Sequence, residues 1–261
     1  MFYLEVLSYP LYELLFFFVI YAFLGWILEI IYAYYSHGYF INRGFLNGPF
    51  CPIYGFGALS LVLFLDNFKD NIILLFILGT IFTSVIEYVT AVVLEKAFNT
   101  TWWDYTDNAF NIKGRICLSF SLIWGGVSVF LIKFVQPYVK ALVSNLTYPV
   151  SKILFYMFFF YLVIDFILTL KSLIDLNHIL SELYNLSKEM LSNKYFKDIK
   201  TKISKTNIPY LNEAKSKYNS LMETLTPNHK RLLEAFPTMK FKGVTNFISD
   251  IRDKIFSLIK D

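Results

Sequence analysis

Long apolar runs separated by short polar segments dominate the first two thirds of the chain. A helix needs about 20 apolar residues to cross a hydrocarbon core about 30 Å thick. Five runs approach or exceed this length, and we expect each of them to be a membrane-spanning helix. Their ranges are 11–35, 52–65, 72–94, 116–135 and 153–170. The second run is the shortest, and because only residues 66–71 separate it from the third, these two are predicted to form an antiparallel hairpin.

The composition agrees with this pattern. The 261 residues are 56% hydrophobic and 17% charged, whereas soluble domains carry about 25% charged residues. This balance excludes a disordered protein, a disulfide scaffold and a typical cytosolic enzyme. Residues 1–174 contain 9 basic and 10 acidic side chains, while residues 175–261 contain 15 and 10. We therefore predict an all-α fold, with a polytopic membrane helix bundle of about five transmembrane helices over 1–174 and a basic, helical, soluble tail over 175–261.

The distribution of Lys and Arg near the ends of the spans predicts the orientation. With the N-terminus outside, six of these basic residues lie on the cytoplasmic side and four on the outer side. We expect an N-terminus outside and a C-terminus in the cytoplasm. Cys51 and Cys117 then lie near the reducing side and make no metal-binding spacing with His37, so we expect neither a metal nor a cofactor.

Glu29, Glu87 and Asp165 lie well inside the predicted spans, where a buried charge costs at least ~3 kcal/mol. Glu29 shares a helix face with Ala22, Gly25 and Ala33, and Glu87 shares one with Gly79, Thr83 and Ala91. Small residues are typical of faces where membrane helices approach each other closely. Both carboxyl groups are therefore predicted to point into the bundle. Asp165 lies on a polar stripe with Tyr161, Thr169 and Ser172.

Two loops are predicted to meet these acids at one membrane face. Residues 37–51 combine Gly and Pro with many aromatic residues, which favours a re-entrant loop folded back into the bundle. The loop that follows the third span ends at Gly114-Arg115 and contains Trp102-Trp103. The candidate site residues are Glu29, Arg43, Asn47, Tyr54, Glu87, Trp103, Asp104, Tyr105, Arg115 and Asp165. We expect five of them, Glu29, Arg43, Glu87, Asp104 and Arg115, to form a single network, which either binds a polar or anionic substrate or relays protons, or only locks the helices together.

Four sequence blocks resemble a known bacterial family. They are RGFLNGPFCPIYGFG at 43–57, EY at 87–88, WDY at 103–105 and NIKGRI at 111–116. Together they are similar to the CmpB-like family of type IV ABC-transporter permeases, over roughly residues 11–170. The resemblance implies a multi-span transporter component. Because the sequence contains no Gly-x-x-x-x-Gly-Lys-Ser/Thr phosphate loop, ATP hydrolysis would need a separate ATPase subunit.

The tail has patterns of its own. Leu173, Leu176, Leu180 and Leu183 repeat at three- and four-residue steps, which predicts that the fifth helix continues past the membrane and offers a seam for a homo-oligomer over 173–190. A lysine-rich stretch follows at 194–205, and an amphipathic helix is predicted from Thr245 to the end. No nucleic-acid-binding module is present, so membrane lipids and proteins are the expected partners.

The sequence leaves three functions open. The leading interpretation is a permease-like component with a polar pocket at the inner membrane face and no assigned substrate. The first alternative is an enzyme acting on lipid or polyprenyl head groups, which we favour less because no nucleophile–base pair or ATP-binding loop is visible. The second is a structural or regulatory protein that recruits a partner through its tail.

Overall fold

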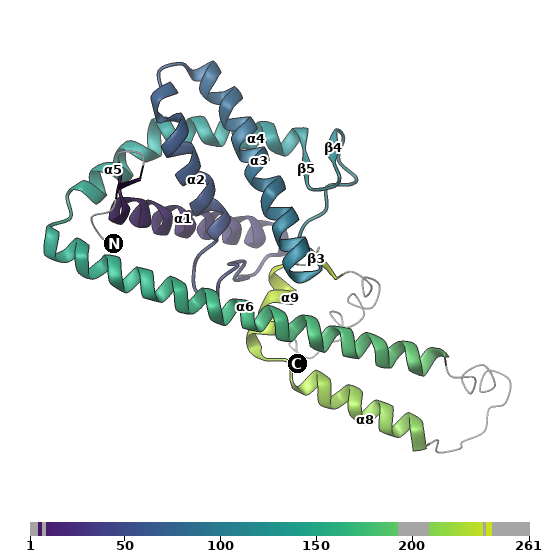
Figure 1. Cartoon of the computed structure of the whole chain (residues 1–261). Coiled ribbons are helices and arrows are strands. Elements are labelled where there is room, and N and C mark those ends of the chain that lie inside the picture. Colours follow the sequence, from purple (N-terminus) through teal and green to yellow (C-terminus); the bar gives the residue numbers. More distant parts are fainter. Residues whose placement is uncertain (1–4, 7–8, 193–208, 237–238, 242–261) are drawn as a thin grey trace.

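The computed structural model describes residues 5–6, 9–192, 209–236 and 239–241, and helices dominate it (Figure 1). The helices are α1 (Leu11–His37), α2 (Pro52–Leu65), α3 (Ile72–Phe98), α4 (Leu118–Phe130), α5 (Gln136–Ser144), α6 (Tyr148–Ser192), α8 (Pro209–Glu223) and α9 (Pro227–Ala235). A 3₁₀ turn at Asp66–Phe68 follows α2, and a π-helical segment at Leu131–Val135 joins α4 to α5. Short antiparallel pairs join β1 (Glu5–Val6) to β2 (Tyr9–Pro10), β3 (Thr100–Thr101) to β6 (Lys240–Phe241), and β4 (Asn111–Ile112) to β5 (Ile116–Cys117).

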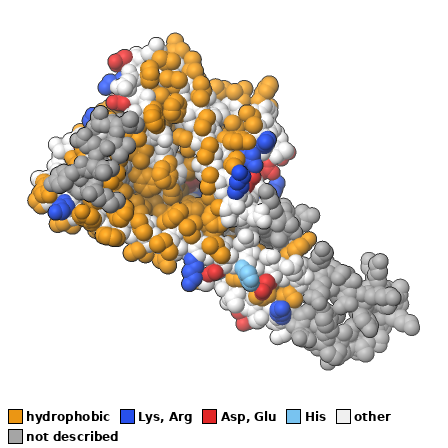
Figure 2. All heavy atoms as spheres, viewed as in Figure 1, with side chains coloured by type: hydrophobic (Ala, Val, Ile, Leu, Met, Phe, Trp, Pro, Cys, Tyr) orange, Lys and Arg blue, Asp and Glu red, His pale blue; other side chains and the backbone are white. Residues whose placement is uncertain are grey.

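Four of these helical segments are long and apolar enough to cross a membrane. They are Leu11–Ser36, Ile72–Phe98, Leu118–Ser144 and Tyr148–Leu186. The second predicted span is a shorter apolar helix, because the 14 residues of α2 extend over only about 21 Å at 1.5 Å per residue. Apolar side chains cover most of the face of the membrane part shown in Figure 2, and charged groups lie toward its edges. The predicted all-α membrane fold is confirmed.

Helix α4 continues into α5 through a local widening of the helix. Pro137 has no backbone N–H to donate to the preceding turn, and the π-helical segment Leu131–Val135 ends just before it. Together the three segments form one apolar unit, which is longer than the span predicted at 116–135.

Small residues bring α3 and α4 into close contact. A Cβ atom added to Gly79 would lie 2.6 Å from the Cβ of Ser128, and one added to Gly125 would overlap the hydroxyl of Thr80. The hydroxyl of Ser84 donates a hydrogen bond of 2.8 Å to that of Ser121. The helices can approach this closely because the contact contains few bulky side chains.

Helix α6 extends well beyond the apolar part of the chain, as the leucine spacing predicts. The four leucines of the predicted seam, from Leu173 to Leu183, are almost fully buried. They pack in one core with Leu232 and Leu233 of α9 and with Phe98 and Trp102 of the membrane part. This core crosses the boundary predicted at residue 174, and a second copy could use the seam only by displacing the chain's own tail. The lysine-rich stretch and the terminal amphipathic helix lie outside the described residues.

The α3–α4 contact predicts different effects for two adjacent glycines. Gly125→Ala should lower the stability of the protein by about 1–3 kcal/mol, because the new methyl group has no room beside Thr80 and Phe76. Gly126→Ala should change it little, since nothing lies within 4 Å of a Cβ there. Thermal unfolding of the two variants in detergent measures the difference. Equal unfolding temperatures would contradict the close helix contact.

Candidate functional site

The two loops that the sequence analysis places at one membrane face lie together, and the tail lies with them. The first loop, residues 38–51, begins at Gly38, which ends α1 in a left-handed conformation (φ 79°). The ring of Phe45 in this loop is 5.4 Å from that of Trp102 in the second loop, residues 99–117. Strand β3 of the second loop pairs with β6 of the tail. We call this region, where the loops and the tail meet, the loop end of the protein (Figure 1).

Asp165 of α6 holds the first loop by its backbone. Its two carboxylate oxygens accept hydrogen bonds of 2.9 Å from the N–H groups of Asn47 and Gly48. The carboxylate is only 5% exposed, and these N–H groups would otherwise lack an acceptor in an apolar surrounding. Gly48 is required here, because a Cβ would overlap the hydroxyl of Tyr161. Asn47 therefore contributes its backbone N–H to the site.

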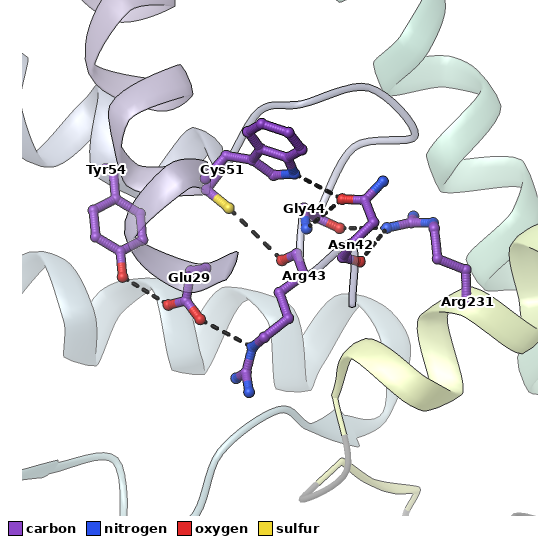
Figure 3. Close-up of polar contacts among 8 residues, drawn as sticks. Glu29, Asn42, Arg43, Gly44, Cys51, Tyr54 and Arg231 are labelled. Carbon is purple, nitrogen blue, oxygen red and sulfur yellow. Dashed lines mark hydrogen bonds and ion pairs between the residues drawn. The ribbon is translucent and has the colours of Figure 1, made fainter. Parts of the chain in front are cut away.

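Arg231 of α9 holds the same loop from the tail. Its guanidinium donates a hydrogen bond of 2.6 Å to the carbonyl of Gly44 and a longer one, of 3.4 Å, to that of Asn42 (Figure 3). The side-chain oxygen of Asn42 in turn accepts hydrogen bonds from Trp26 and from the N–H of Gly44. Burial lowers the pKa of Arg231, and the negative charge of Asp165 acts in the opposite direction. The loop is thus held by an acid on α6 and by a base on α9.

Glu29, Arg43 and Tyr54 form the first polar group of the site (Figure 3). The Nε of Arg43 is 3.0 Å from one carboxylate oxygen of Glu29, and the Tyr54 hydroxyl donates a hydrogen bond of 2.7 Å to the other. The Tyr54 ring lies so close to α1 that a Cβ on Gly25 would overlap it. Ala22 is fully buried on the same face. Glu29 thus lies on the helix face of Ala22 and Gly25 and contacts both the first loop and α2.

Glu87 and Tyr105 form the second polar group. The Tyr105 hydroxyl donates a hydrogen bond of 3.1 Å to Oε1 of Glu87. Glu87 is 9% exposed, and its Oε2 is buried with no hydrogen-bond partner among the described residues. Burial raises the pKa of Tyr105, and the negative charges of Glu87 and Glu29 raise it further. Acids from two different helices therefore both raise the pKa of this hydroxyl.

The second loop pairs its charges with residues that the sequence analysis did not select. Arg115 binds Glu95 with two parallel bonds of 3.1 and 2.6 Å and also donates to the hydroxyl of Tyr88. The N–H of the Trp103 ring donates to the backbone carbonyl of Arg115. This arrangement fixes the start of β5 and α4 against α3.

Asp104 is bound to the tail. Lys240 of β6 approaches its carboxylate to 2.6 Å. Hydrogen bonds from Lys240 and then from Thr106 lower the pKa of Asp104 to about 2. The carboxylate is therefore ionised throughout the neutral range. Its ion pair with Lys240 contributes fully to stability at pH values above the ordinary pKa of an aspartate.

The single network predicted from the sequence is thus divided. Arg43 pairs with Glu29 and Tyr105 with Glu87, whereas Arg115 and Asp104 bind other partners, Glu95 and Lys240. Glu95, Lys240 and Arg231 were missed. Glu95 lies at the end of a predicted span, where a charged side chain is expected to be exposed to water. Nothing in the tail sequence indicates that Arg231 or Lys240 contacts loops more than 100 residues away. Among the described residues, no group of three His, Cys, Asp or Glu side chains is placed to hold a metal ion.

This arrangement defines a polytopic α-helical membrane protein with a polar site at one end of its spans. The family model described as "Putative ABC-transporter type IV" matches residues 16–170, more than half of the chain. The chain belongs to this family and is a transporter-like membrane protein. No curated protein and no solved structure matches it.

Proposed function

We propose that the chain is the permease-like membrane subunit of a transporter and that Glu29, Arg43, Tyr54, Glu87 and Tyr105 form its cargo site. The observation that carries this proposal is the pair of acids within α1 and α3, Glu29 and Glu87, each of which accepts a hydrogen bond from a tyrosine hydroxyl. Acidic residues within membrane helices are costly and mark pathways for ions and substrates. The site also offers the guanidinium of Arg43 and two tyrosine hydroxyls, which suit a polar cargo.

The loop end faces the cytoplasm in this proposal. It carries Arg43, Lys113, Arg115 and the basic tail, and positive charge near span ends favours the cytoplasmic side. The turn between α2 and α3 then lies outside. With the tail at the cytoplasmic side, a cytoplasmic ATPase subunit can reach the loops that hold the site. The energy for transport comes from that separate chain, because this sequence has no phosphate-binding loop of its own.

Purification from native membranes tests both the partner and the orientation. The tagged full-length chain should co-purify with a protein that has a Gly-x-x-x-x-Gly-Lys-Ser/Thr loop and hydrolyses ATP. A photo-cross-linker attached at Ser220→Cys, on the exposed face of α8, should capture this protein, and the same cross-linker at Asp70→Cys, in the exposed α2–α3 turn, should not. Cys51 and Cys117 are buried and give little background labelling.

Two results would overturn this proposal. Repeated absence of an ATPase from the purified material, with an unrelated multi-span protein as the control, would exclude a stable ATPase-coupled complex. Capture of the ATPase from position 70 but not from position 220 would reverse the orientation.

A regulatory role for the tail is the second candidate, and the contacts of Arg231 favour it. Arg231 holds the carbonyls on both sides of Arg43, the residue that pairs with Glu29. A protein that displaces α9 would therefore release the loop that carries Arg43.

The variant Arg231→Gln tests this role. It should leave the ATPase bound but weaken the stimulation of ATP hydrolysis by cargo, because Arg43 is no longer held in place. Lys230→Gln, the neighbouring residue of α9, is the control. Equal stimulation in both variants would exclude this role for Arg231.

A further inference from the structure

We propose that Glu87 is a proton-binding site that exchanges its proton for the positive charge of a cargo. This inference deepens the proposed function, since it assigns a chemical class to the cargo of the same site. It rests on the position of Glu87 in α3 and on the groups that surround it.

Among the described residues, the arginines of the site compensate other acids than Glu87. Arg43 pairs with Glu29, and Arg115 binds Glu95 through two bonds. The ionisable groups that act on or contact Glu87 are the hydroxyl of Tyr105, the thiol of Cys117 and, through Tyr105, the carboxylate of Glu29. All of them are neutral or negative at neutral pH, so none balances a carboxylate at position 87.

A negative charge on Glu87 would be costly. An ionised carboxylate that is 9% exposed and receives one hydrogen bond loses far more hydration than the hydroxyl of Tyr105 replaces. Protonation removes this cost. Because Oε1 accepts the hydrogen bond of Tyr105, the proton resides on Oε2, the atom without a described partner.

The oxygen atoms around Glu87 suit a proton better than a calcium ion. A hard divalent cation requires six or more oxygen ligands. Glu87 and Tyr105 together supply three oxygen atoms, of which two belong to one carboxyl group. This number is far below the six to eight oxygen ligands of a calcium site, whereas a single carboxyl oxygen is enough to bind a proton.

The exchange is balanced in charge. When a cationic group of the cargo, such as an ammonium, reaches the site, the Oε2–H bond breaks and a water molecule that enters with the cargo takes the proton. The carboxylate that remains pairs with the cation. One positive charge enters as one leaves, so the site stays neutral in both states. When the cargo departs, Oε2 takes up a proton again.

Infrared spectroscopy of the purified full-length protein in lipid tests the resting state. The wild-type protein at pH 7 should show the carbonyl band of a protonated carboxyl group, and Glu87→Gln should lack it. Glu29→Gln is the matched control, because Glu29 lies 3.0 Å from the guanidinium of Arg43 while Glu87 has no such partner among the described residues, and this variant should keep the band. If the band is identical in the wild type and in Glu87→Gln, Glu87 is ionised and the proposal fails.

Two further measurements test the exchange and guard against misfolding. Methylammonium chloride should reduce the band in the wild type at constant pH, while sodium chloride at equal ionic strength should not. A band unaffected by methylammonium would overturn the cationic class of cargo. Glu87→Gln should unfold at the wild-type temperature, because Gln resembles the neutral acid, and a large decrease would indicate a carboxylate paired with a cation. These results do not depend on an ATPase partner, so failure of the transporter assignment is seen separately.

Discussion

The site depends on the carboxylate of Asp165, which accepts two backbone hydrogen bonds from the first loop. Irregular backbone is tolerated at membrane depth only where the protein or a water-filled cavity satisfies its polar groups. Asp165 supplies acceptors for Asn47 and Gly48 from α6, and Arg231 supplies donors to the carbonyls of Asn42 and Gly44 from α9. Residues 42–48 are therefore held between the carboxylate of Asp165 and the guanidinium of Arg231. Backbone N–H groups compensate the negative charge, and backbone carbonyls compensate the positive one.

The other polar contacts follow from the position of this loop. With residues 42–48 fixed, Arg43 reaches Glu29 on α1, and the chain turns at Cys51 into α2, whose Tyr54 contacts the same carboxylate. Glycines make room for each step, since Tyr54 packs on Gly25 and Tyr161 packs on Gly48. The tail contributes more than charge, because its leucines share a core with Phe98 and Trp102. Membrane part and tail are thus one structural unit at the loop end.

Much of this arrangement is predictable from the sequence, because it depends on local spacing. The apolar runs, the α2–α3 hairpin, the continuation of α6 and the small-residue faces of Glu29 and Glu87 all follow from residues within a few turns of each other. The partners of the charged side chains do not follow from local spacing. Arg115 pairs with Glu95 rather than with Glu87 or Asp104, and Asp104 pairs with Lys240. These choices depend on distances set by helix packing and by the return of the tail, which one-dimensional patterns do not record. The predicted seam of α6 is a related case, since the spacing shows that the leucines are buried but not which helices bury them.

The central claim is that Asp165 fixes the first loop, and hydrogen exchange at the amides of Asn47 and Gly48 tests it most directly. Hydrogen bonds to a charged group contribute about 1.5–3 kcal/mol each, so Asp165→Asn should increase the exchange rate of at least one of the two amides by roughly 10- to 100-fold. Asp107→Asn, at an exposed position in the second loop, should leave both rates unchanged. If the two amides exchange in Asp165→Asn as slowly as in the wild type, the loop is held by other contacts, and the role assigned to Asp165 is contradicted.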